Sequence, residues 1–179
     1  MRQPRSRSNR SPDQAGHRPR PARDRGAPPQ VQVNGLSDYL EVMSKSVFQT
    51  GMSWDLINNK WPGIHEAMHG FDPEVLANLP PWELDQLMTD KRVIRNRRKL
   101  EAIVQNAQQL IELDIAHGGF RNYLRSHANY DALEKDIRKR FRFMGQMGIY
   151  SFVYTVGEPV PEFHEWAAAR GKHFHADAD

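Results

Sequence analysis

Apolar residues recur at helical spacing along most of this chain, from Leu36 to Gly171, and no stretch alternates between polar and apolar side chains. The spacing is clearest from Leu100 to Ile111, and Gly118-Gly119 follows as an end signal. Gly145 to Val156 is apolar and aromatic enough to form a central buried helix. We therefore predict an all-α domain over residues 36–171.

Side-chain caps indicate where several of these helices begin. Ser53 can cap one helix, and Asp72, which is followed by proline, can cap another. Asp131 and Glu134 have the spacing of a capping box. We expect Trp61-Pro62-Gly63 to interrupt the helix that Ser53 begins, because proline lacks the N–H that a helix interior uses.

The two ends of the chain differ in composition from the helical region. Residues 1–33 are rich in Arg and Pro and nearly free of large apolar side chains, which predicts a disordered tail. Residues 1–35 carry a net charge of +6, so the chain's total of +3 leaves the central region acidic. This tail either adds affinity for nucleic acid or is a solvated linker. Residues 172–179 form a polar C-terminal end.

Composition excludes several classes of protein. The 179 residues include no cysteine, which excludes disulfides and thiolate zinc sites. His65 and His69 are four residues apart without a third ligand in sequence, so we expect no metal, and no motif predicts a cofactor. No apolar run reaches the ~18 residues of a membrane helix and no signal peptide is seen. We expect a cytoplasmic protein, nucleoid-associated if bacterial, without a membrane partner.

Two basic clusters lie within the otherwise acidic helical region. The first places six cations in nine residues at the start of the helix around Leu100, where free N–H groups favour phosphate. The second precedes two phenylalanines. Both suggest a polyanion as partner, although a charge run is often only a solvated helix face. Their members are Lys91, Arg92, Arg95, Arg97, Arg98 and Lys99, and then Lys135, Arg138, Lys139, Arg140 and Arg142.

The segment from Gln49 to Trp54 joins two predicted helices through Gly51. Glycine allows close approach of another molecule, because no Cβ is in the way. Met52 offers a wedge and Trp54 a flat stacking surface, which suits the handling of a planar ring such as a nucleobase. The alternative is that both side chains belong to the core at a helix junction.

With these residues together, the chain resembles the 3-methyladenine DNA glycosylase I family of the helix-hairpin-helix DNA glycosylase superfamily. Four sequence blocks carry the resemblance in the family's order, over about Ser37 to Gly157. They are Gln49-Thr50-Gly51-Met52-Ser53-Trp54, then Phe71-Asp72-Pro73, then Ile94 to Leu100 with Asn106-Ala107, and last Lys139 to Gly145 followed by Tyr150-Ser151-Phe152.

The resemblance implies a glycosylase-like helical fold and an enzyme of base-excision repair. Such an enzyme flips an alkylated adenine (3-methyladenine) out of double-stranded DNA and hydrolyses its N-glycosidic bond. It also implies that Trp54 stacks on the base, with Gln49 lining the pocket. Gly51 and Met52 are then expected to fill the gap left in the DNA.

The resemblance further implies that the helix-hairpin-helix block holds phosphates through Arg95, Arg98 and Lys99. Ser46 stands at the catalytic position, where the family has the glutamate that recognises the base, and a serine cannot offer a negative charge to a cation. The family's N-terminal segment with pocket aromatics and zinc ligands is replaced here by the Arg/Pro-rich tail. We expect a monomeric glycosylase. The alternatives are a non-catalytic DNA-binding module with the same fold and a helical protein-interaction domain.

Overall fold

The computed structural model describes residues 28–171, and over these residues the chain is helical and contains no strand, which confirms the predicted all-α class. The elements are α1 (Leu36–Gln49), α2 (Trp54–Ala67), the 3-10 helix η1 (His69–Phe71), α3 (Pro73–Ala77), α4 (Pro81–Leu87), α5 (Arg97–His117), α6 (Phe120–Arg125), α7 (Tyr130–Arg140), α8 (Gln146–Thr155) and α9 (Phe163–Ala169). The predicted tail over residues 1–27 and the polar end 172–179 lie outside this range.

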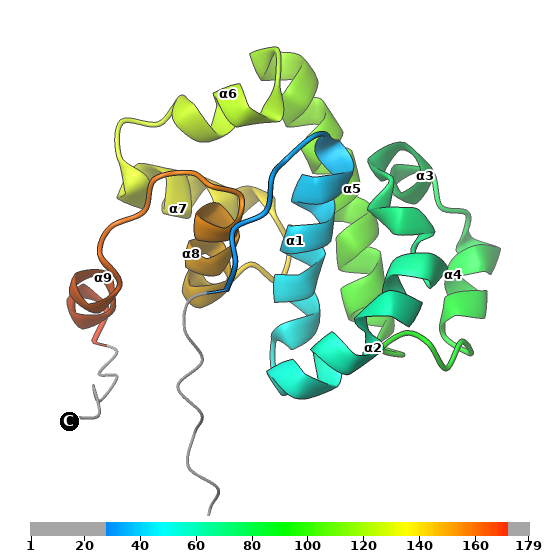
Figure 1. The fold of residues 1–179 in the computed structure, drawn as a ribbon. Coiled ribbons are helices and arrows are strands. Elements are labelled where there is room, and N and C mark those ends of the chain that lie inside the picture. The colour runs from blue at the N-terminus through cyan, green and yellow to red at the C-terminus, as the bar shows by residue number, and fades with distance from the viewer. Residues whose placement is uncertain (1–27, 172–179) are drawn as a thin grey trace, which may run out of the picture.

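Helices α1, α5 and α8 form the centre of the molecule, with α2, α3 and α4 on one side and α6, α7 and α9 on the other (Figure 1). Their facing sides are apolar, and the side chains that fill the centre are inaccessible to solvent. Each such side chain contributes roughly 1.5–3 kcal/mol on burial. They include Leu40, Met43 and Phe48 of α1, Leu100, Ile103 and Leu110 of α5, and Phe152 and Val153 of α8.

The segment before α1 is fixed against α8. The N–H of Val31 donates to the carbonyl oxygen of Thr155 at 2.8 Å, and the Gln30 amide donates to the Tyr154 carbonyl at 3.0 Å. Val33 packs on the core. Residues 28–33, which the sequence placed in the disordered tail, thus have a defined place, because two backbone carbonyls at the end of α8 accept hydrogen bonds from them.

The local end signals were mostly right. The Ser53 hydroxyl accepts from the N–H of Leu56, and the Asp72 carboxylate accepts from those of Glu74 and Val75, so both predicted caps are confirmed. Gly118 ends α5 in the left-handed conformation, as expected. The predicted interruption at Pro62 was wrong, since α2 continues through it. Pro62 is exposed, so the helix carbonyl that it leaves unpaired can face water.

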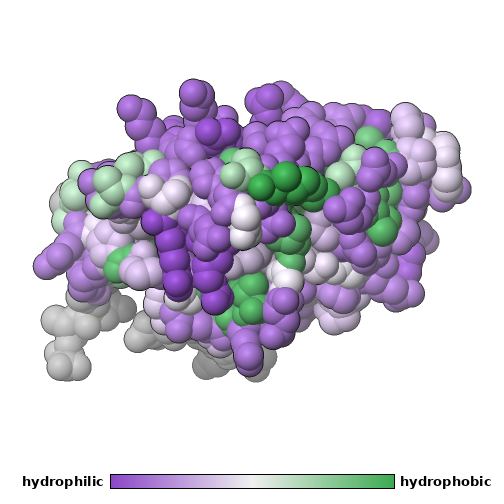
Figure 2. All heavy atoms as spheres, turned by 90° about the horizontal axis from the view of Figure 1, so that it is seen from above, coloured by the Kyte–Doolittle hydropathy of each residue, from purple (hydrophilic) through white to green (hydrophobic). Residues whose placement is uncertain are grey.

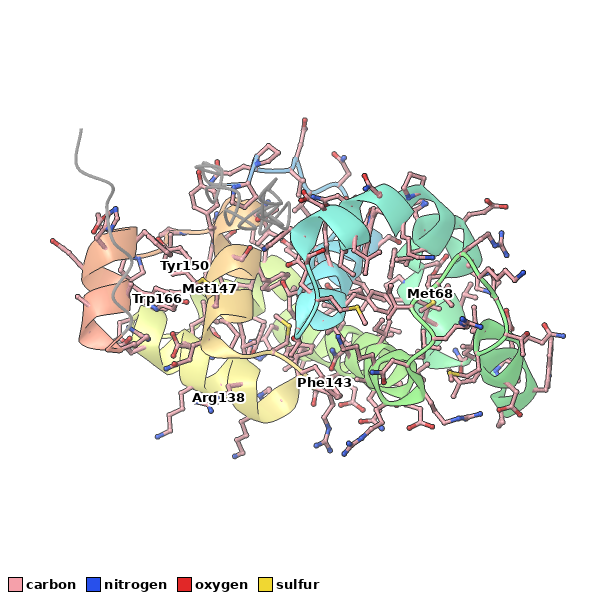
Figure 3. All side chains as sticks on the ribbon, turned by 90° about the horizontal axis from the view of Figure 1, so that it is seen from below. Met68, Arg138, Phe143, Met147, Tyr150 and Trp166 are labelled. Carbon is pink, nitrogen blue, oxygen red and sulfur yellow. The ribbon has the colours of Figure 1, made fainter. Side chains whose placement is uncertain are left out.

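The predicted capping box at the start of α7 was also wrong. Asn129 caps α7, by accepting from the N–H of Ala132 at 2.9 Å. Glu134 is buried and bonds to α9 instead, where it accepts from the Trp166 indole and pairs with Arg170 at 3.0 Å. Figure 3 shows Trp166 of α9 close to Tyr150 and Met147 of α8. Glu134 is thus used to fasten the last helix, which sequence spacing alone does not reveal.

Exposed apolar side chains are spread over several helices in residues 28–171. Trp82 of α4 is the most exposed tryptophan, and Ile115 of α5 and Val75 of α3 are exposed elsewhere. The face seen from above is mainly hydrophilic, with separate small apolar groups (Figure 2). None of the described helices is long and apolar enough to cross a bilayer.

Lys99 joins α5 to the end of α1. Its side chain is only 4% exposed, and its ammonium donates to the carbonyl oxygens of Phe48 at 2.8 Å and Thr50 at 2.6 Å. These are carbonyls that the end of α1 leaves without helical partners. Burial lowers the pKa of the Lys99 ammonium. The first turn of α5 and the corner after α1 are therefore held as one unit.

We predict that Lys99→Met lowers the free energy of unfolding by about 1–3 kcal/mol, because it removes both hydrogen bonds and leaves the Phe48 carbonyl unpaired. Urea denaturation measures the change. Arg98→Met, at the exposed neighbouring position, is the matched control and should stay within about 0.5 kcal/mol of the parent chain. Equal stability of the two variants would show that the Lys99 contacts do not hold the corner.

Candidate functional site

The corner between α1 and α2 is a tight turn. The N–H of Met52 donates to the carbonyl oxygen of Gln49 at 2.9 Å. Thr50 has φ −56° and ψ 108°, and Gly51 has φ 78°. These angles define a type II turn, whose third residue needs a positive φ and is therefore glycine. A Cβ on Gly51 would meet no atom within 4 Å, so backbone conformation and not space demands the glycine.

A cavity of about 250 Å³ opens beside this corner. One face of α1 forms its wall, the segment 28–31 and α8 close two further sides, and two tryptophans of α2 complete it. Three of the residues predicted for the base pocket line this cavity together, namely Ser46, Gln49 and Trp54. The structure therefore brings the predicted pocket residues into one concave site.

Trp54 and Gln49 both have free binding groups in the cavity. Trp54 is 38% exposed, and no other aromatic ring between residues 28 and 171 stacks on it. The Nε2 atom of Gln49 is buried and has no hydrogen-bond partner in this part of the chain. An unpaired buried amide costs free energy unless a ligand satisfies it. A flat ring with polar edges meets both requirements.

Ser46 lies where α1 and α8 come closest. It is 7% exposed, and its hydroxyl donates to the carbonyl oxygen of Gly148 at 3.3 Å. A Cβ on Gly148 would stand 3.4 Å from that of Ser46, so a small residue on α8 allows this approach. Ser46 thus reaches the cavity wall with its hydrogen already directed to a carbonyl.

Three further residues line the cavity, namely Glu41, Lys45 and Trp61. The sequence patterns gave these residues no role. The Trp61 indole donates to Glu41 Oε1 at 2.7 Å, and its ring stacks on Phe71 at 5.3 Å between centroids. The Lys45 ammonium lies 5.4 Å from the Trp61 ring centroid. Helical spacing could have found the first two, since positions 41, 45 and 49 share one face of α1.

Burial lowers the pKa of Lys45, and the negative charge of Glu41 partly opposes this shift. Both carboxylates of the cavity wall already accept hydrogen bonds from the protein. Glu41 accepts from Trp61, and Asp38 Oδ2 accepts from the backbone N–H groups of Asn34 at 2.7 Å and Gly35 at 3.0 Å. The cavity therefore holds a cation, while its anions have partners.

The first basic cluster divides into paired and unpaired side chains. Arg97 pairs with Asp85 and Glu101, and Arg92 pairs with Asp90 and Glu66. Arg95 and Arg98 are exposed and form no ion pair within residues 28–171. They flank Asn96, whose side chain caps α5. These two arginines are thus available to an anion.

Lys99 differs from its neighbours, since its ammonium is buried on the Phe48 and Thr50 carbonyls and not at the surface. The sequence predicted that it holds a phosphate. The structure instead directs its ammonium to the two carbonyls that precede Gly51.

The loop between α7 and α8 places an aromatic side chain near the second basic cluster. Phe143 has φ 56° and is 41% exposed. The buried Asn106 side chain fixes the preceding residue, accepting from the Arg142 N–H at 2.7 Å and donating to its carbonyl at 3.1 Å. Figure 3 shows Phe143 beside α5, with Arg138 pointing outward from α7. The backbone just before Phe143 is thus fixed from α5.

The metal site of the resembling family finds no counterpart in the described part of the chain. No group of three or more metal-binding side chains lies together in residues 28–171, and the sequence has no cysteine. The described residues therefore do not fit a zinc ion.

Known proteins with similar sequences indicate a family for this chain. A family model described as methyladenine glycosylase matches residues 31–140. DNA-3-methyladenine glycosylase of Haemophilus influenzae is 30% identical over 130 residues, which cover 61% of this chain and 70% of that protein. DNA-3-methyladenine glycosylase 1 of Escherichia coli is 28% identical over 130 residues, which again cover 61% of this chain and 70% of that protein.

Solved structures are similar as well. 3-Methyladenine DNA glycosylase I from Staphylococcus aureus has a TM-score of 0.62 at 25% identity, covering 71% of this chain and 79% of that one. A variant of 3-methyladenine DNA glycosylase I in complex with 3-methyladenine has a TM-score of 0.63 at 28% identity, covering 73% and 80%. The family that the four sequence blocks predicted is confirmed. Because the matched residues 31–140 are more than half of this chain, the chain belongs to the methyladenine glycosylase family.

Proposed function

We propose that this protein is a DNA glycosylase that turns an alkylated adenine out of duplex DNA and hydrolyses its N-glycosidic bond. The observation that carries the proposal is the cavity shared by Trp54, Gln49 and Ser46 next to the Gly51 corner. 3-Methyladenine, the base in the names of the relatives, is the first substrate to test.

Each residue has a role that follows from its place. Trp54 stacks on the flipped ring, and stacking on an aromatic face is worth about 1–3 kcal/mol per base. The Gln49 amide meets a polar edge of the base, since its Nε2 has no partner of its own. Met52, directly after the turn glycine, fills the space that the base leaves. Its side chain is partly buried against the core, which supports it from behind.

The DNA backbone is held beside the corner. Arg95 and Arg98 are exposed at the start of α5, where the helix dipole also favours phosphate. Lys99, in the same turn, fixes the carbonyls that precede Gly51. Binding of phosphate at the start of α5 and filling of the gap by Met52 are therefore coupled through one rigid turn of helix. Such contacts position a duplex without selecting its sequence.

We predict that the full chain releases 3-methyladenine from methylated duplex DNA, and that Trp54→Ala lowers this release about tenfold through lost stacking. Chromatography of the freed base measures the release. Trp82→Ala is the matched control, because Trp82 is 60% exposed on α4 away from the cavity. Equal losses in the two variants would contradict the role of Trp54. Duplex binding without release of any base from the parent chain would favour a non-catalytic module.

We also predict a change in the salt dependence of duplex binding. Replacing both Arg95 and Arg98 by alanine should reduce the slope of log K against log salt by about 2, since each phosphate contact contributes roughly 0.9. Titrations at several salt concentrations give the slope. Arg97→Ala is the control, because Arg97 is already paired with two carboxylates. An unchanged slope in the double variant would place the DNA elsewhere.

A further inference from the structure

Lys45 is a cation in the cavity where the proposed function places a damaged base. 3-Methyladenine in DNA carries a positive charge, and a pocket for it should offer anions and open aromatic faces. Here Trp54 offers an open ring, but Lys45 lies over the ring of Trp61. Ser46 supplies no charge, both carboxylates accept hydrogen bonds from the protein, and the protein's own ammonium lies 5.4 Å from the Trp61 centroid.

Two side chains of the cavity offer free hydrogen-bond donors. Lys45 has three N–H bonds and the buried Gln49 Nε2 has two without a partner in residues 28–171. An uncharged adenine ring presents acceptor nitrogens at its edges, whereas methylation at N3 removes one of them and adds positive charge. The donor set therefore matches an uncharged purine better than a cationic one.

We propose that Lys45 extends the substrate range of this cavity to an uncharged alkylated adenine, of which N6-methyladenine is the simplest, and acts as the general acid for its release. The proposal rests on the glycosylase function proposed above. It differs from that function in the charge of the base and in the residue that assists its departure.

An uncharged base needs this assistance because its glycosidic bond is not weakened by a positive ring. As the bond between C1′ and N9 breaks, the bonding electron pair leaves with the base. Lys45 Nζ gives a proton to a ring nitrogen, so that the base departs neutral. Water adds its oxygen to C1′, and the proton that the water loses restores the Lys45 ammonium, so the net reaction is hydrolysis.

Lys45 is suited to this role by its surroundings. It is half-buried, and burial lowers its pKa towards the range in which an ammonium gives up a proton readily. Glu41, one helical turn earlier on the same face of α1, partly opposes this lowering of the Lys45 pKa through its negative charge. Its neighbour Trp61 is fixed by the hydrogen bond to Glu41 and by stacking on Phe71.

Two isomeric lesions test the proposal, because N6-methyladenine and 3-methyladenine contain the same atoms and differ in charge when joined to DNA. The full chain and its variants are incubated with a duplex containing one N6-methyladenine and with methylated DNA, and both freed bases are measured. We expect the parent chain to release both. Lys45→Met should lower N6-methyladenine release about 100-fold, the contribution of a general acid, and should raise 3-methyladenine release, because it removes a positive charge from the cavity.

Two further variants separate acid catalysis from charge and from folding. Lys45→Arg keeps the positive charge but cannot give up a proton, so N6-methyladenine release should fall as in Lys45→Met without any gain for 3-methyladenine. Lys60→Met, on α2 outside the cavity, should match the parent chain with both bases. Thermal unfolding confirms that each variant is folded.

The outcomes distinguish this proposal from the function on which it rests. Release of 3-methyladenine but not N6-methyladenine by the parent chain, or equal N6-methyladenine release by the parent chain and Lys45→Met, overturns the role of Lys45 and leaves the glycosylase function intact. Release of neither base by the parent chain overturns both.

Discussion

The hydrogen bonds from one buried ammonium to two carbonyl oxygens fix the start of α5 relative to the corner between α1 and α2. Lys99 reaches from the first turn of α5 to Phe48 and Thr50, which precede the turn at Gly51. The same turn of α5 presents Arg98 to solvent. Lys99 thus connects the proposed phosphate site at Arg98 to the corner beside Trp54. Without this connection the position of the corner relative to α5 would be free to vary.

The second constraint is the close packing of α1 on α8. Gly148 lets Ser46 approach, and the segment 28–31 is bonded to the end of α8. The cavity is therefore enclosed by elements far apart in sequence, while one face of α1 supplies most of its chemistry. This explains how a chain with an Arg/Pro-rich N-terminus still closes a pocket, since a few residues just before α1 are enough to cover it.

The sequence could predict those features that depend on residues close to one another along the chain. The caps at Ser53 and Asp72 and the helix end at Gly118 follow from local hydrogen bonds and backbone angles. The short helix α6 and the passage of α2 through Pro62 were missed, because tertiary packing and solvent decide them. Lys99 was predicted to hold a phosphate together with Arg95 and Arg98, because it belongs to the same run of six cations. Its burial depends on where the carbonyls of α1 end, which no local pattern encodes.

The exchange of charge in the cavity has a consequence for how this branch of the family can work. Where a base is cationic, the weakened bond does much of the chemistry and the protein needs only to stack and attract it. In this cavity Ser46 offers no charge, and the Lys45 ammonium lies over the ring of Trp61. Repulsion weakens the hold on a charged base, but the same proton-bearing group can activate an uncharged one. A single helix face, with Ser46 and Lys45 side by side in sequence, can therefore shift recognition from the charge of the lesion to its hydrogen-bonding edge.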